Sequence, residues 1–87
     1  MQDEYDDVRR EIAEGSRHAE EAGGLLAEAI GDLEESIRVL KGTTYTTSQE
    51  APGLALSSLN ACAELLAHTI GELQAADATA VSWANSL

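Results

Sequence analysis

Apolar residues recur every three or four positions from Asp3 to about Lys41, with no proline among them. That period places them along one side of an α-helix. They form two columns, each with members seven residues apart. The columns are Tyr5, Ile12, Ala19, Leu26, Leu33 and Leu40, and Ser16, Gly23, Ile30 and Ile37. Two such columns predict one long helix, residues 3–41, with a coiled-coil seam.

The same heptad pattern returns near the carboxyl end and predicts a second helix over residues 53–85. Its columns are Leu59, Leu66, Leu73, Ala80 and Leu87, and Leu56, Ala63, Ile70, Asp77 and Ala84. The intervening stretch is rich in threonine, serine, proline and glycine, which predicts a loop at residues 42–52. The predicted fold class is all-α: residues 1–87 form a single antiparallel two-helix hairpin.

Turn signals and large-to-small matching define the expected details of this hairpin. Gly42 suits a left-handed helix C-cap, Thr47 and Glu50 have capping-box spacing, and Pro52 suits a first helical turn. We predict one register throughout the seam. In it, Leu33 pairs with Leu59, Leu26 with Leu66, Ala19 with Leu73, Ile12 with Ala80 and Tyr5 with Leu87, while Ile30 meets Ala63, Gly23 meets Ile70 and Ser16 meets Asp77.

An internal repeat relates the two predicted helices. Leu25–Leu33 reads LLAEAIGDL, and Leu65–Leu73 reads LLAHTIGEL. Each copy contains a mid-helix glycine, Gly31 or Gly71, which costs about 1 kcal/mol relative to alanine. The repeat therefore indicates either a duplicated helix or a closely approaching neighbour at both glycines.

Size and charge narrow the classes of partner. A two-helix hairpin of 87 residues buries little surface, so we expect dimerisation to complete it as a four-helix bundle. The net charge of −11 disfavours binding to nucleic acid or to anionic membranes, and no segment predicts membrane insertion. The amino end lacks the pattern of a cleaved signal peptide, so we expect a cytoplasmic location or export without one.

Residues that could carry chemistry are few. Cys62 has no histidine at helical contact spacing, and His18 and His68 fall on different helices without a Glu-x-x-His motif. The acidic start of the first helix suits the positive end of the helix dipole. We therefore expect no catalytic, metal or cofactor site, and no enzyme activity.

The second helix is the better candidate for binding, because only three of its residues are charged: Glu64, Glu72 and Asp77. A helix with so few charges is usually covered on more than one side. Trp83 either anchors a partner or closes the open end of the hairpin against Val8 and Ile12. The predicted interface residues are Leu54, Cys62, Leu65, Thr69, Ala76 and Trp83.

A short, acidic, alanine-rich helical hairpin resembles the WxG-type small helical proteins of type VII secretion systems. It is also similar to the helical segments that head actinobacterial polymorphic toxins. The family's Trp-x-Gly turn has no counterpart in residues 42–53, since the tryptophan lies in Trp83-Ala84-Asn85, and its Tyr-x-x-x-Asp/Glu export signal is absent. The resemblance implies a hairpin that pairs with other helices in secretion or toxin delivery.

Two functions from different classes follow from these patterns. The first is a non-enzymatic helical protein–protein interaction module that forms a dimer with itself or with another helical protein. The alternative is an acidic inhibitor or antitoxin that masks a basic surface. Salt distinguishes them, because electrostatic masking weakens steeply with ionic strength and an apolar helix interface does not.

Overall fold

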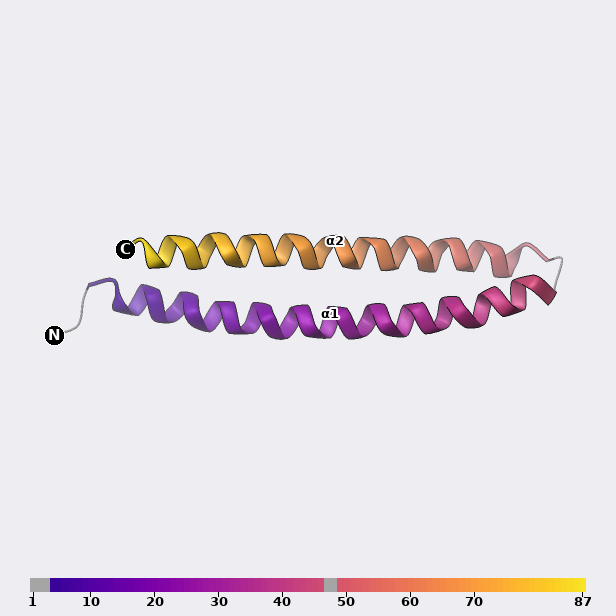
Figure 1. Cartoon of the computed structure of the whole chain (residues 1–87), viewed down its shortest axis with the longest axis horizontal. Coiled ribbons are helices and arrows are strands. Elements are labelled where there is room, and N and C mark those ends of the chain that lie inside the picture. Colours follow the sequence, from indigo (N-terminus) through magenta and orange to yellow (C-terminus); the bar gives the residue numbers. More distant parts are fainter. Residues whose placement is uncertain (1–3, 47–48) are drawn as a thin grey trace.

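The computed structural model confirms the all-α antiparallel hairpin, and it describes residues 4–46 and 49–87. Two helices, α1 (Asp6–Thr46) and α2 (Ala51–Asn85), lie side by side in opposite directions (Figure 1). The hairpin measures 71 × 15 × 12 Å, so it is a thin rod. The amino end of α1 lies beside the carboxyl end of α2, and this end of the rod is called the open end.

Acidic residues open α1. The Arg9 amide donates to the Tyr5 carbonyl over 2.9 Å, and Asp6 and Asp7 occupy the first turn. Arg10 donates to Asp7 over 3.1 Å. Carboxylates in the first turn complement the partial positive charge at this end of the helix, which favours helix initiation here.

Helix α1 extends past the predicted boundary. The prediction of a left-handed C-cap at Gly42 is wrong, because the helix continues to Thr46 and none of the described glycines has a positive φ. The Thr44 hydroxyl donates to the Leu40 carbonyl over 2.8 Å, and Thr44 is half-buried in line with the seam. Thr44 lies one heptad beyond Ile37, so it continues the half-buried band of α1 past the predicted end of the helix.

Helix α2 begins at Ala51, with Pro52 in its first turn as predicted. Proline is tolerated there because the first amides of a helix have no intrahelical acceptor. Glu50 is the N-cap residue, but its side chain makes no capping hydrogen bond. Thr47, the other half of the predicted capping box, lies outside the described residues.

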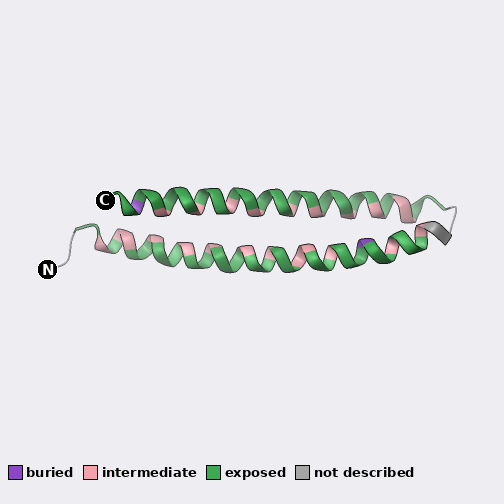
Figure 2. Cartoon of the chain, in the orientation of Figure 1, coloured by how far each residue is buried: buried purple, intermediate pink, exposed green. Residues whose placement is uncertain are grey.

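The seam lies where the sequence predicts it, as a half-buried band along the facing sides of both helices (Figure 2). Tyr5 and Ala80 are exceptions, since both are exposed. Val81 is half-buried in place of Ala80. A straight α-helix drifts by about 20° per heptad, so the inward-facing position moves on by one residue toward the end of α2.

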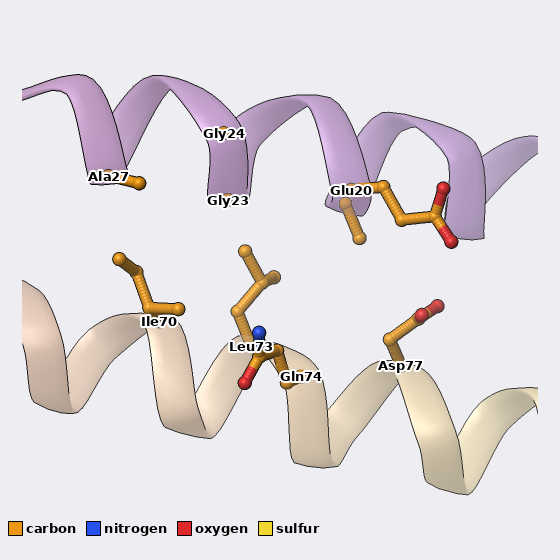
Figure 3. A pocket seen from close by; sticks show the side chains of 9 residues that line it. Glu20, Gly23, Gly24, Ala27, Ile70, Leu73, Gln74 and Asp77 are labelled. Carbon is orange, nitrogen blue, oxygen red and sulfur yellow. The ribbon is translucent and has the colours of Figure 1, made fainter.

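The predicted pairing along the seam is wrong by about one helical turn. Leu73 points toward Gly23 rather than Ala19, and Ile70 lies opposite Ala27 rather than Gly23 (Figure 3). Leu59 likewise lines a hollow with Ser36, Val39 and Leu40, not with Leu33. The cause lies in the turn: because α1 continues to Thr46, the centre of the turn moves toward the carboxyl end, and every α2 residue meets a later residue of α1.

Candidate interaction surface

The six predicted interface residues are all exposed on α2. Cys62, Thr69, Ala76 and Trp83 are spaced seven apart, so they follow one flank of the helix. Leu65 lies three residues from Cys62 and joins that flank. Leu54 lies eleven residues before Leu65, which is three helical turns, so its side chain leaves α2 on nearly the same side, nearer the turn.

A shallow hollow on this flank brings α1 and α2 together. It is lined by Ala29, Asp32, Leu33, Ser36, Cys62, Leu65 and Leu66. Leu33 and Leu66 belong to the seam and form its apolar floor, while small side chains form most of the rim. The name apolar face is used below for this side of the hairpin: Leu25, Ala29, Asp32, Ser36 and Val39 of α1 with Ser58, Cys62, Leu65 and Thr69 of α2.

The contribution of α1 to this face was not predicted from the sequence. Leu25 is 67% exposed and Val39 is 54% exposed. Each lies seven residues from Asp32, which lines the hollow, so all three share one side of α1. The sequence does contain a signal, since Leu25 and Val39 are large apolar residues that belong to neither seam column. The many acidic residues of α1 obscure it.

The opposite side of the hairpin, called the polar face below, has a different composition. Its hollow beside the same part of the seam is lined by Glu34, Ile37, Arg38, Lys41, Asn60, Ala63 and Glu64. Arg10 and Arg17 occupy the same heptad position as Arg38. Basic side chains therefore concentrate on the polar face, while the apolar face as defined carries one charged residue, Asp32.

The strongest local electrostatic effect lies on the outer surface of α1. The Arg38 guanidinium donates to both carboxylate oxygens of Glu35, over 2.6 and 3.1 Å. These hydrogen bonds, and then the charge of Arg38, hold the pKa of Glu35 below its ordinary value of 4.5. The same contacts raise the pKa of Arg38. Both side chains are solvated, so the pair affects the local surface charge and does not form a binding site.

Trp83 lies at the open end and is 53% exposed. The buried residue there is its neighbour Ala84, at 6% exposure. A hollow at this end is lined by Arg9, Ile12, Ala13, Ser16, Val81, Ala84 and Asn85, without Trp83. Ala84 rather than Trp83 is therefore the buried residue at the open end, and about half of Trp83 remains accessible.

The histidines and the cysteine lie on the surface of the hairpin. In α1, His18 is 3.7 Å from Glu21 and 4.0 Å from Glu14, and in α2, His68 is 2.9 Å from Glu72. Each of these contacts joins residues of the same helix. Cys62 is an exposed free thiol. Within residues 4–46 and 49–87, no three metal-ligating side chains form a group, and neither helix has a stretch both long and apolar enough to cross a membrane.

The paired glycines of the internal repeat have open surroundings. A Cβ added at Gly31 or Gly71 would meet no atom within 4 Å outside its own local helix. Close packing between α1 and α2 therefore does not explain them. Both glycines lie at the heptad position of Arg38 and Glu64, on the polar face.

Comparisons with known protein families, with curated proteins and with solved structures find no match.

Proposed function

We propose that this protein is a non-enzymatic helical interaction module whose hairpin is completed by another helical protein surface. The observation that carries this proposal is the burial pattern. Among the described residues, only Ile37 and Ala84 are buried, at 8% and 6% exposure. A domain that folds independently normally buries several large side chains completely, so this hairpin has a seam but no closed core.

The exposed apolar side chains support the same proposal. Leu25, Val39, Leu54, Leu65 and Trp83 each leave more than half of their surface in solvent. Single exposed apolar residues are common, but several on one thin hairpin are typical of surfaces that are covered in an assembly. Three of them, Leu25, Val39 and Leu65, lie on the apolar face, where Leu65 lines the hollow.

Dilution tests this function. If a partner surface completes the hairpin, the thermal midpoint followed by circular dichroism at 222 nm should rise with protein concentration, over about a hundredfold range, or on addition of a helical partner. Light scattering after size exclusion should show the corresponding complex. A cooperatively folded monomer with a concentration-independent midpoint, to which no helical protein binds, would contradict the proposal.

The setting in secretion or toxin delivery remains part of this proposal, supported by the resemblance of the acidic, alanine-rich hairpin to WxG-type proteins. Its test is export of a tagged chain by a cell that has a type VII secretion system. We expect secretion to stop when that system is deleted. Retention of the chain in the cell both with and without the system would contradict this setting but leave the interaction function intact.

A further inference from the structure

The accessible surface of the hairpin exceeds that of a compact protein of its mass. It exposes 6354 Å², whereas a folded monomer of 9.2 kDa exposes about 4,900 Å². The excess is about 1,400 Å² for each chain. If two chains buried this excess against each other, the interface would fall in the range of about 2,000–5,000 Å² that obligate homodimers bury.

The distribution of charge favours the apolar face for such an interface. At a net charge of −11, two copies repel each other, so association requires a face with few carboxylates. The apolar face as defined carries Asp32 alone, and Glu72 lies beside it, one heptad beyond Leu65. Most of the acidic residues of α1 then remain in solvent on the outer sides of a paired assembly.

The spacing of large and small side chains makes the apolar face complementary to itself. On α1, Leu25 and Val39 each lie two turns, about 10.5 Å, from Asp32, on opposite sides of it. A two-fold axis perpendicular to the helices at Asp32 places Leu25 against Val39 of a second copy and Ala29 against Ser36. A two-fold interface requires such reciprocal contacts.

The second helix matches the same axis. The axis passes through the hollow, which on α2 lies between Cys62 and Leu65. Rotation brings Leu65 of each copy against Cys62 of the other, so a large side chain faces a small one. The same rotation brings Thr69 against Ser58. Because the axis lies toward the turn, the acidic amino ends of the two copies lie far apart, beyond the region of overlap.

We propose that the apolar face docks a second copy of this chain, antiparallel to the first, as a four-helix dimer centred on the hollow around Asp32, Cys62 and Leu65. This inference rests on the proposed interaction function and names its partner. It also assigns Leu25 and Val39 of α1 to the interface, and it places Trp83, at the open end, outside it.

Crosslinking through the single cysteine tests the axis. A short bismaleimide should convert the wild-type chain to covalent dimer, because the two Cys62 thiols lie near the axis. The matched control is Cys62→Ala/Ala78→Cys, which moves the thiol to the polar face. Mixing Cys62→Ala/Leu25→Cys with Cys62→Ala/Val39→Cys should give more mixed dimer than either chain gives alone. Equal crosslinking by the wild type and the polar-face control overturns the proposal.

Two exposed apolar side chains of α2 provide the energetic test. Leu65 is 65% exposed beside the hollow, and Trp83 is 53% exposed at the open end, beyond the region of overlap. By sedimentation equilibrium, Leu65→Ala and Leu25→Ala should each raise the dimer Kd by about tenfold or more, since each is lost from both copies. Trp83→Ala should leave the Kd unchanged. Equal effects of Trp83→Ala and Leu65→Ala overturn the assignment of the face.

A charge change at the two-fold axis distinguishes docking of a second copy from docking of a basic partner protein. Asp32→Asn removes two like charges that face each other, so the dimer Kd should fall several-fold, and added salt should also lower it. A folded monomer at all concentrations overturns self-docking. If that monomer binds another helical protein and Leu65→Ala weakens the complex, the interaction function stands and the partner named here is wrong.

Discussion

The two halves of the hairpin use the same heptad pattern with different side chains. In the turn half, which is α1 after about Ala27 and α2 before about Thr69, the seam is mostly leucine and isoleucine, and it contains Ile37, one of the two buried residues among those the structure describes. In the open half the seam includes Ser16, Ala19, Gly23 and Asp77. Large side chains fill the turn half, whereas the small ones of the open half leave a hollow beside Gly23, although Ala84 is buried at its end.

The stability of the hairpin is therefore concentrated near the turn. Contacts near the turn close the shortest loops, so they form at the lowest entropic cost and also bury the most apolar surface. Contacts near the open end close long loops for little burial. The open end should therefore fray first, and its amides should exchange with solvent faster than those around Ile37.

The largest expected effect comes from truncating the same residue type in each half. Ile37→Ala removes the most buried large side chain of the hairpin and should cost about 2–4 kcal/mol, enough to unfold much of an isolated hairpin. Ile12→Ala, at a half-buried position of the open half, should cost clearly less. Urea denaturation at one fixed, low protein concentration measures both, and equal costs would remove the proposed difference between the halves.

The next effect should reduce the difference between the halves. Asp77 is half-buried in the seam and lies across from Glu20, so a carboxylate occupies an inward-facing position near another (Figure 3). Asp77→Leu restores the apolar heptad there and should raise stability by about 1–2 kcal/mol.

Asp77→Asn isolates the charge, because it keeps nearly the same shape. Its gain in urea denaturation should be positive but smaller than that of Asp77→Leu. Amide exchange around Ile12 and Val81 should slow in Asp77→Leu if the open half is tightened. A destabilised Asp77→Leu would show that the carboxylate has a partner that supports the fold.

The heptad columns were sufficient to predict both helices and the seam, because burial along a coiled coil follows the period of the sequence. They were not sufficient for the register. The pairing depends on where the turn is centred, and α1 continues through Gly42–Thr46 although glycine and threonine have low helix propensity. A one-turn shift preserves the heptad match, so the pattern alone cannot distinguish the two pairings.

The candidate surface was predictable only in part. Scarcity of charge identified the exposed flank of α2, but Leu25 and Val39 lie on a helix whose overall composition is acidic. Their membership of the same face becomes visible only when α1 and α2 are placed side by side.

Glycines give the third effect in order of size. Gly23 lies in the seam of the open half opposite Leu73, yet an added Cβ there would meet no atom within 4 Å. Gly23→Ala should therefore stabilise the hairpin by about 1 kcal/mol through helix propensity. Gly31→Ala is the control, because it gives the same gain in helix propensity at an exposed position of the polar face, outside the seam.

The excess of Gly23→Ala over Gly31→Ala in urea denaturation measures what a methyl group adds to the open half. We expect a small positive excess. Gly31→Ala and Gly71→Ala should also leave the dimer Kd unchanged, because both glycines lie on the polar face. A loss of association in either variant would show that a partner backbone approaches these glycines closely.

The smallest effect is on the outer surface of the turn half, at the Glu35–Arg38 pair. The pKa of Glu35 is lowered in the folded chain, so its contribution to stability is present above the unfolded pKa and is lost as the pH falls through the folded value. Arg38→Gln should return the pKa of Glu35 toward 4.5 in a carboxyl NMR titration. The free energy of unfolding should change little, because both groups are fully solvated. Lys41→Gln is the control, since it removes a nearby charge and keeps the hydrogen bonds. If Arg38→Gln destabilised the hairpin as much as Ile12→Ala, surface charge rather than the seam would have to account for the greater stability of the turn half.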